Sequence, residues 1–275
     1  MAIITIARQE GSLSKEITEG LAKRFGWQYV TKAVIAKEVP ERYGVNADII
    51  SKYDEKKPGL FESFSNYHDK FNRYFELYFL EKVIADPNCI LLGRGGAFFL
   101  RNVPGVFRIR VVGSKAIRIK RIMDLYSLDE RSARKFMTEQ DNNRAEYTRF
   151  FYNMSWDDAD SYDLVINTDQ LDMEVLYSML ERVIEIFNQK GYTEKLVQRL
   201  QELYLAQKIT VCLMYEKKIP IHFLDVEVKG NVAVVMGTVE HGDLIGQVID
   251  IVKSFDGIDQ VENKMMSIKG YPSAE

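Results

Sequence analysis

The first residues that could do chemistry stand between a strand and a helix near the start of the chain. Residues Ile3–Ala7 are apolar and largely β-branched, and they lead directly into Arg8-Gln9-Glu10-Gly11-Ser12-Leu13-Ser14-Lys15. A helical pattern of apolar residues begins at Ile17 and ends at Gly26. Because the N–H groups at a helix N-terminus bind anions, this strand, loop and helix predict a phosphate site.

The loop departs from the standard phosphate loop, GxxxxGK[ST], in which the lysine contacts phosphate and the hydroxyl binds Mg²⁺. Gly11 is present, but Ser14 stands where the lysine is expected and Glu16 replaces the hydroxyl. Lys15 follows one residue later. One residue on a helix corresponds to about 100° of rotation, so the sequence alone does not give Lys15 the role of that lysine.

Basic residues cluster further along the chain and favour a small polyanionic ligand. Two of them, Arg118 and Arg121, have the i, i+3 spacing that places them on one helix face. The cluster lies between residues 108 and 149 and consists of Arg108, Arg110, Lys115, Arg118, Lys120, Arg121, Arg131, Arg134, Lys135, Arg144 and Arg149. For Lys120, Arg134 and Lys135 a solvated helix surface is the favoured interpretation.

Arg94 is a separate candidate, because it follows the apolar strand Asn88–Leu92 and stands between two glycines. A guanidinium fork suits a phosphate dianion, and flanking glycines allow close backbone approach. The sequence offers no comparable metal ligands, since its three histidines are scattered and Asp157 and Asp158 are better explained as surface acids.

Composition excludes several classes of function. The chain has 275 residues, 46% hydrophobic and 28% charged, with a net charge of −3. It is not basic enough in bulk for a nucleic-acid surface, and no apolar run approaches the roughly 20 residues of a membrane span. No charged-then-apolar leader precedes the first strand. Cys89 and Cys212 stand far apart in apolar runs, which predicts buried free thiols in a reducing cytoplasm.

The elements that position these residues alternate between strands and helices. Strands are predicted at 3–7, 88–92, 106–112 and 163–167, and helices at 115–125, 129–141 and 173–190. This alternation predicts an α/β domain with a parallel sheet and right-handed crossovers. A helix at 61–78 carries aromatic residues at spacings of three and four, which indicates a core or oligomer face, with a base-stacking pocket as the alternative.

The pattern changes after Gly191. A helix from Thr193 towards Tyr215 precedes a hairpin at 223–237, a helix at 244–255 and a strand at 261–268. We therefore expect two domains, 1–190 and 191–275, of which the second is a small αββαβ unit. Each part has apolar sequence for its own core, so the fragments 1–190 and 192–275 should each fold when expressed separately.

The first domain resembles the cytidylate kinase-like family. Its motifs are ARQEGSLSKEI at Ala7–Ile17, Gly93-Arg94-Gly95 after the second predicted strand, the arginine-rich segment, and the YDLVIN strand at Tyr162–Asn167. The resemblance implies the P-loop fold of nucleoside-monophosphate kinases: a five-stranded parallel sheet flanked by helices, with a helical insert and a closing lid. It also implies ATP and Mg²⁺ as cofactors and a nucleotide substrate.

The resemblance also assigns roles to residues. The loop from Gln9 to Ser14 would hold the donor phosphates, with Arg8 or Lys15 supplying charge, and Arg94 would contact the acceptor phosphate. Gly95 stands where related enzymes carry an aspartate, and Val30-Thr31-Lys32 replaces their Tyr-Asp-Lys. The implied catalytic residues are Lys15, Arg94, Asp141 and Arg144, the implied donor-binding residues Arg8, Gln9, Gly11, Ser12, Leu13, Ser14 and Lys15, and the implied substrate-binding residues Arg94, Arg118, Arg121 and Arg131.

The second domain resembles the BON domain, a module of bacterial envelope and stress proteins. The residues that carry the resemblance run from Asp225 to Val239 and from Gly257 to Asn263. The resemblance implies a ligand-sensing or oligomerisation module, so a homo-oligomer could form through this domain or through the aromatic helix at 61–78.

Two functions remain open at this point. One is a nucleotide kinase that transfers a phosphoryl group from ATP to a CMP- or dCMP-like acceptor. The other is a nucleotide-binding regulatory protein that has lost catalysis and acts through its BON-like module. Arg94 and the arginine-rich segment favour the kinase, whereas the displaced Lys15 and the missing hydroxyl favour the regulator.

Overall fold

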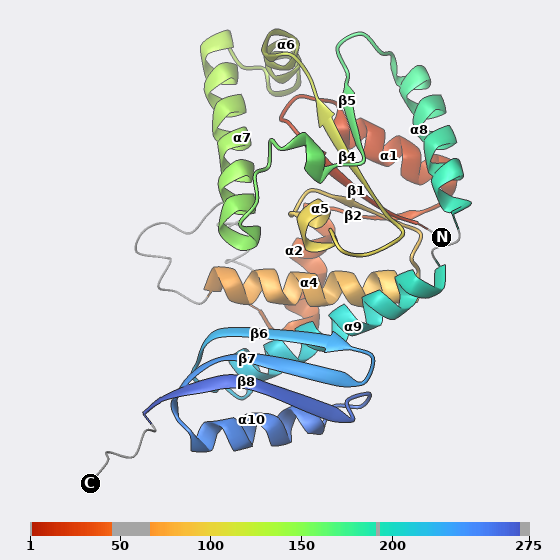
Figure 1. Ribbon diagram of the computed structural model, residues 1–275. Coiled ribbons are helices and arrows are strands. Elements are labelled where there is room, and N and C mark those ends of the chain that lie inside the picture. Colours follow the sequence, from red (N-terminus) through yellow and green to blue (C-terminus); the bar gives the residue numbers. More distant parts are fainter. Residues whose placement is uncertain (1, 46–66, 191–192, 270–275) are drawn as a thin grey trace. The chain divides into compact units, whose positions relative to one another are not determined.

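The computed structural model describes residues 2–45, 67–190 and 193–269. Its larger sheet has five parallel strands in the order β2-β3-β1-β4-β5, and their bounds are β1 Ile3–Arg8, β2 Gln28–Val30, β3 Cys89–Leu92, β4 Val106–Val112 and β5 Leu164–Asn167. The α/β class and the parallel sheet are thereby confirmed (Figure 1). The pattern of apolar residues had predicted every strand except β2, which is only three residues long and half exposed.

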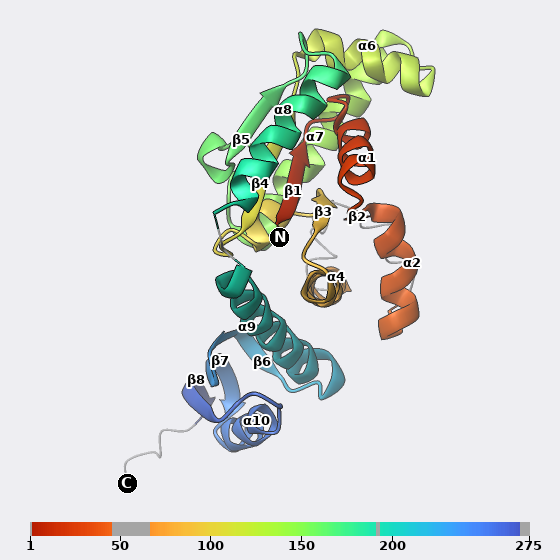
Figure 2. The ribbon, with the colours of Figure 1, turned by 90° about the vertical axis from the view of Figure 1, so that its right-hand side faces the viewer.

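One face of this sheet carries the main apolar core. Ile4 and Ile6 of the central strand β1 and Ile109 and Val111 of the adjacent strand β4 contribute to this core. Helices α1 (Ser14–Phe25) and α8 (Met173–Asn188) cover this face with apolar stripes that include Ile17, Leu21, Leu176, Leu180 and Ile184. Figure 2 shows α8 in front of the sheet, on the side away from α7. Helix α2 (Lys32–Tyr43) follows β2 and is capped by Thr31.

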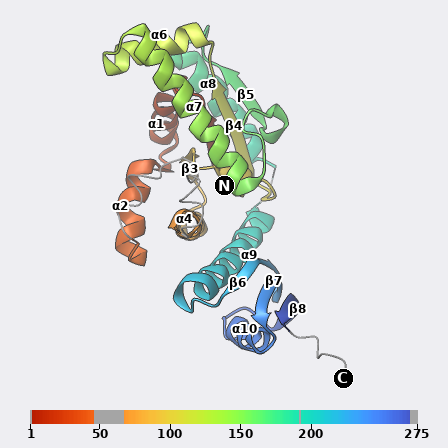
Figure 3. The ribbon, with the colours of Figure 1, turned by 90° about the vertical axis from the view of Figure 1, so that its left-hand side faces the viewer.

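The opposite face carries the helices that bring charged residues to the strand ends. Helices α5 (Gly96–Phe99) and α7 (Glu130–Tyr152) lie on this face, and a short 3₁₀ turn follows α7 at Ala159–Ser161 (Figure 1). Helix α6 (Lys115–Tyr126) packs against α7 and lies beyond the ends of the strands (Figure 3). Helix α7 begins where it was predicted, capped by Asp129, but it continues eleven residues past the predicted end at Asp141. Its longer course matters, because Arg144, Tyr147 and Thr148 lie in the added turns.

The C-terminal part forms a smaller sheet of three strands. Helix α9 (Thr193–Val211) continues as a π-helical turn to Glu216, and then come β6 (Ile221–Lys229), β7 (Val232–His241), α10 (Asp243–Lys253) and β8 (Gln260–Lys269). Strand β7 pairs antiparallel with β6 and parallel with β8. The predicted order of helix, hairpin, helix and strand is therefore confirmed. Its core contains Ile209, Val228, Val235, Val248 and Val252, all nearly inaccessible to solvent.

The chain divides into two compact units, and one element falls on an unexpected side of the division. The first unit comprises Met1–His68 and Ala85–Leu196, and the second comprises Asp69–Ile84 and Val197–Glu275. Helix α4 (Tyr67–Ala85) thus belongs by its contacts to the second unit, although the predicted domain 1–190 contains it. Hydrogen bonds from α9 and the π-helical turn to this helix include Tyr204 to Glu81 (3.3 Å), Gln207 to Glu76 (3.1 Å) and to the carbonyl of Arg73 (2.9 Å), and Tyr215 to Asp69 (2.5 Å).

Two further expectations concern buried side chains. The described aromatic residues of α4, among them Phe71, Tyr74, Phe75 and Tyr78, are buried within a single chain, which supports a core role, whereas Phe61 and Phe64 lie outside the described residues.

Cys89 and Cys212 are both free and buried, as predicted. In the ranges that the structure describes, no helix is long and apolar enough to cross a membrane.

Candidate functional site

The loop between β1 and α1 is shaped by two residues with left-handed backbone. Gly11 has a φ of 76° and Leu13 a φ of 63°. A Cβ at position 11 would lie 2.8 Å from the carbonyl oxygen of Arg118, so only glycine fits against α6 there. The helix then begins at Ser14, which places the loop at the positive end of α1.

The carbonyl groups of this loop are held from behind by α6 and by the end of β5. Arg118 donates from Nη1 to the carbonyl of Glu10 (3.1 Å), and Arg121 donates to that of Gly11 (3.4 Å). The hydroxyl of Thr168 donates to the carbonyl of Ser12 (3.2 Å). Within the described residues, the backbone N–H groups of residues 11 to 14 donate to no acceptor. The loop therefore fixes its carbonyls and leaves a row of N–H groups for an anion.

Arg118 and Arg121 hold the loop in place. The side chain of Arg118 is 4% exposed and contacts Asp141 (2.6 Å) and the carbonyl of Gly113 (3.0 Å). Arg121 also donates to the hydroxyl (2.9 Å) and the carbonyl (2.8 Å) of Thr168. The sequence correctly predicted that Arg118 and Arg121 share one helix face, but this face contacts the carbonyl groups of the loop.

Glu10, Asp141 and Arg144 link the loop to helix α7. The amide of Glu10 donates to one carboxylate oxygen of Asp141 (2.8 Å), whose other oxygen pairs with Arg118. The carboxylate of Glu10 pairs with Arg144 (2.5 Å), which also lies 3.5 Å from Asp141. All four side chains are largely buried, so two arginines and two carboxylates form a neutral, weakly screened network at the loop.

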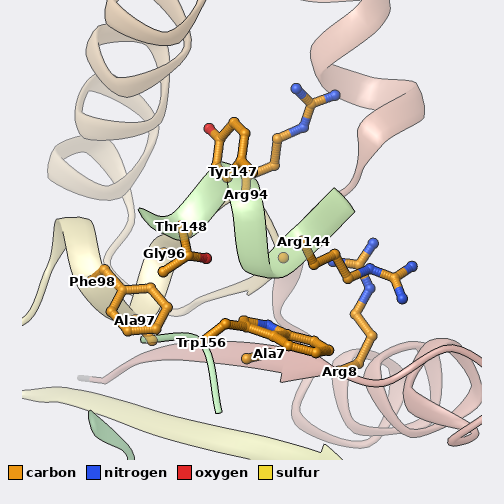
Figure 4. A pocket seen from close by; sticks show the side chains of 12 residues that line it. Ala7, Arg8, Arg94, Gly96, Ala97, Phe98, Arg144, Tyr147, Thr148 and Trp156 are labelled. Carbon is orange, nitrogen blue, oxygen red and sulfur yellow. The ribbon is translucent and has the colours of Figure 1, made fainter. Parts of the chain in front are cut away.

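A pocket beside this network contains Arg94. It is lined by Arg8, by the segment from Gly93 to Phe98, and by Arg144, Tyr147, Thr148 and Trp156. Figure 4 shows these side chains, with Arg8 and Arg144 converging at one side of the pocket. Arg94 is 2% exposed and has a φ of 55°, a backbone conformation that is rare for residues other than glycine. Arg8 and Arg144 bring two guanidinium groups to this pocket, which favours a compact anion such as a phosphate, whereas the guanidinium of Arg94 points away from theirs (Figure 4).

The glycine after Arg94 has a steric explanation. A side chain at position 95 would overlap the ring of Tyr152, which comes from the end of α7, and the hydroxyl of Tyr152 lies 3.5 Å from the carbonyl of Arg94. The aspartate of related enzymes could not be placed here without moving that ring. Gly95 and Tyr152 therefore form one packing unit.

Two candidate residues lie apart from this group. Lys15 is on the exposed side of α1 with 74% of its side chain accessible, and its Nζ lies 3.9 Å from Glu19. Arg131 is exposed in the first turn of α7. Of the remaining candidates, Arg8, Arg94 and Arg144 line the pocket, where Arg8 and Arg144 converge and Arg94 points away from them. Gln9, Gly11, Ser12, Leu13 and Ser14 form the loop, and Asp141 supports it.

The surroundings of the loop fit an anionic nucleotide better than a bare metal ion. Guanidinium and amide groups predominate, and the described residues contain no group of three or more histidine, cysteine, aspartate or glutamate side chains that could hold a metal. The hydroxyl of Ser12 donates to the carbonyl of Gln9 (2.7 Å).

Several residues of the site could not be recognised from the sequence. Glu10 and Thr168 act through partners more than 130 positions away, and their residue types carried no signal. Tyr147, Thr148 and Trp156 line the pocket. Trp156 offered one hint, because the sequence has only two tryptophans.

The strand order β2-β3-β1-β4-β5 and the loop that joins the first strand to the N-terminus of α1 define an α/β fold of the P-loop kinase type. The chain belongs to the cytidylate kinase-like family, whose model matches residues 3–170. This match covers the first unit up to the loop after β5.

Sequence relatives agree with this assignment. The cytidylate kinase of Methanocaldococcus jannaschii is 26% identical over 186 residues, which are 66% of this chain and 97% of that protein. The cytidylate kinase of Thermoplasma acidophilum is 23% identical and covers 70% of this chain and 98% of its own length. Among solved structures, an uncharacterized protein from Eubacterium ventriosum aligns with a TM-score of 0.52 at 19% identity, over 67% of this chain and 99% of that one.

Proposed function

We propose that this protein is a nucleotide kinase that transfers a phosphoryl group from ATP to a nucleoside monophosphate of the CMP or dCMP type. The observation that carries the proposal is the pairing of two anion sites. The loop from Gln9 to Ser14 offers amides to the donor phosphates, and the adjoining pocket offers the guanidinium groups of Arg8 and Arg144 to the acceptor phosphate. Arg94 lines the same pocket, and in this proposal its side chain turns towards the acceptor phosphate when the acceptor binds.

The arrangement suits the demands of phosphoryl transfer. The reaction needs in-line positioning of donor and acceptor and neutralisation of the transferring charge, and it needs no covalent nucleophile on the protein. In this proposal the loop amides and the dipole of α1 bind the donor, while Arg94 fixes the acceptor phosphate. Arg144 lies between the two sites, beside Glu10 of the loop and within the Arg94 pocket, and stabilises the charge that moves between them.

The cofactor and the setting follow from the same proposal. Mg²⁺ would arrive bound to the phosphates of ATP and would keep several of its waters. The reaction would take place in the cytoplasm, where both thiols stay reduced and nucleotides are available.

A second candidate is a nucleotide-binding regulator without turnover. It is favoured by the position of Lys15, which lies on the exposed side of α1, and by the ion pair through which Glu10 already neutralises Arg144. In that case the αββαβ part, with its likeness to BON domains, would be the output module and the means of self-association.

One pair of measurements separates the two functions. Calorimetric binding of ATP, CMP, dCMP and UMP comes first, followed by a coupled assay of ADP formation with each acceptor in the presence of Mg²⁺. The kinase proposal expects binding together with acceptor-dependent ADP formation, highest for CMP or dCMP. Binding without turnover favours the regulator, and the absence of any nucleotide binding contradicts both.

A further inference from the structure

A second hollow opens beside the phosphate loop, at the carboxyl ends of β4 and β5. It has a volume of about 370 Å³, and its wall includes Gln9, Arg110, Val112, Asp157, Val165 and Asn167. Arg110 and Val112 alternate along β4, and Val165 and Asn167 alternate along β5, so the four residues lie on one face of the sheet. Ligands of open α/β sheets bind outside the carboxyl ends of the strands, which is where this cleft lies.

The side chain of Arg110, in the wall of the cleft, is held in one position by several contacts. Its guanidinium carbon lies 4.7 Å from the ring centre of Trp156 and 5.5 Å from that of Tyr162, and it donates to the carbonyl of Trp156 and to the carboxylate of Asp157. Burial raises the pKa of Tyr162 to about 12, so its hydroxyl stays protonated and donates to the same carbonyl (2.9 Å). The side chain of Arg110 is 5% exposed, and its Nε has no hydrogen-bond partner within the described ranges.

Asp157 is held by this buried arginine, yet 69% of its own side chain is open to solvent. An exposed carboxylate normally samples several rotamers, but the ion pair to Arg110 fixes one of its oxygens. The carboxylate therefore presents a positioned acceptor to the cleft.

Two amide side chains have their orientation fixed by the backbone. The Oε1 atom of Gln9 accepts from the amide of Gly113 (3.2 Å), and the Oδ1 atom of Asn167 accepts from that of Asp169 (2.9 Å). Since the oxygens are engaged, the NH₂ groups remain as donors. The cleft thus combines one carboxylate acceptor, two amide donors and the apolar side chains of Val112 and Val165.

The carboxylate acceptor and the amide donors of the cleft match one edge of an amino-substituted base. Cytosine and adenine carry an exocyclic amino group beside an unprotonated ring nitrogen, which is a donor next to an acceptor. Uracil and guanine carry an oxygen and a protonated nitrogen in the same places, so their oxygen would face the Asp157 carboxylate. The apolar side chains suit the flat face of a ring, and the volume suits a base with its ribose.

We propose that this cleft binds the amino-substituted base, cytosine or adenine, of a nucleotide whose phosphate lies at the adjoining site, and that Asp157 selects for the amino group. The inference rests on the proposed nucleotide function and adds the residues that choose the base. Gln9 connects the two sites, because it belongs both to the phosphate loop and to the wall of the cleft.

The test compares the dissociation constants of CMP, UMP, ATP and GTP by calorimetry for the wild type and for Asp157→Asn. The asparagine keeps the shape and can still accept from Arg110, but it removes the charge that favours an amino group. We expect the wild type to prefer the amino base in one pair, CMP over UMP or ATP over GTP. In the variant, the ratio of the two dissociation constants of that pair should fall about tenfold. Asp160→Asn is the matched control, because Asp160 is exposed on the neighbouring turn and does not line the cleft.

A second variant keeps the test informative if Asp157→Asn does not fold. Asn167→Ala leaves the pair of Arg110 and Asp157 intact and should weaken the same nucleotide severalfold, with the thermal midpoint checked alongside. A change confined to ATP and GTP assigns the cleft to the donor base, and one confined to CMP and UMP assigns it to the acceptor base. Unchanged ratios in both pairs, with nucleotide binding intact, overturn the inference. A wild type that binds no nucleotide overturns the proposed function and this inference together.

Discussion

Glu10 is the residue whose chemistry is least expected at an anion site. It places a carboxylate 2.5 Å from Arg144, in a region where the pocket otherwise gathers guanidinium groups. In the proposed kinase, an incoming phosphate would compete with Glu10 for Arg144, and this ion pair would lower the affinity of the site for phosphate.

Replacing that carboxylate should therefore improve binding. Glu10→Gln is expected to tighten ATP or inorganic phosphate binding about tenfold, because Arg144 no longer has to be released from a charged partner. Calorimetric titration measures the effect. Glu130→Gln is the matched control, since Glu130 forms an exposed ion pair with Arg134 on the same helix. Unchanged or weaker binding by Glu10→Gln would show that Glu10 does not compete with the ligand.

Gly11 can be tested against a glycine with the same backbone but open surroundings. Gly11→Ala places a Cβ 2.8 Å from the carbonyl of Arg118, whereas a Cβ at Gly26, where φ is 67°, meets nothing within 4 Å. Both substitutions carry the left-handed strain of about 1 kcal/mol, but only Gly11→Ala should also displace the loop and abolish nucleotide binding. Thermal unfolding and ATP titration of the two variants provide the comparison. Equal ATP affinity in both would mean that the loop tolerates the shift.

At the scale of elements, the site depends on how α6 and α7 present their polar faces. The spacing of Arg118 and Arg121 predicted a common face, but spacing does not say whether that face meets a ligand or the protein. The predicted end of α7 at Asp141 falls short of the observed end at Tyr152, and the stretch between them has no glycine or proline to stop a helix. Contacts such as Glu10 with Arg144 join positions 134 apart and have no local signature.

The hairpin of β6 and β7 depends on one acid from α9. Glu202 accepts hydrogen bonds from the amide of Gly230 (3.0 Å), from Arg199 (3.0 Å) and from Gln198 (3.1 Å). Desolvation alone would raise the pKa of Glu202, but these hydrogen bonds hold that pKa below its usual value. A lowered pKa means that the charged form stabilises the fold above the unfolded-state pKa, and that this stability is lost as the pH falls through the folded-state value.

Glu202→Gln should therefore destabilise the protein at pH 7 by about 1 kcal/mol, and the difference should vanish as the pH falls below about 4. Urea unfolding of wild type and variant at pH 7, 5 and 3.5 measures this trend. Glu194→Gln, at the exposed start of α9, is the control. A deficit that stays constant across this range would exclude the charge of Glu202 as its source.

At the scale of the whole molecule, α4 lies within the first domain by its position in the sequence but belongs to the second unit by its contacts. The helix lies between β2 and β3 in sequence, but its polar residues contact α9 and the turn after it. Glu76 is 4% exposed and accepts from Asn72 (3.0 Å) and from Gln207, so its carboxylate needs partners from both helices. The apolar periodicity of α4 predicted a buried helix, but the identity of its partner is set by residues more than 120 positions away.

The boundary near residues 190 and 191 remains a prediction, which fragments can test. The fragment 192–275 retains the core of α9, α10 and the small sheet, so we expect it to fold. It should be less stable than the same unit in the full chain, because Gln207 and Tyr215 lose their partners on α4. Hydrogen exchange of β7 in fragment and full chain measures the difference. Equal protection would mean that α4 contributes nothing, and no protection would mean that the boundary is wrong.

The measurement that tests the central proposal most directly is the KM for CMP at saturating ATP, for the wild type and for Arg94→Ala. Arg101→Ala, which changes an exposed arginine just after α5, serves as the control. Loss of a charge-assisted contact of about 1.5–3 kcal/mol should raise the KM for CMP about ten- to a hundredfold, with the KM for ATP nearly unchanged. A wild type that transfers no phosphoryl group to CMP or dCMP, or an Arg94→Ala variant that affects both substrates equally, would contradict the account.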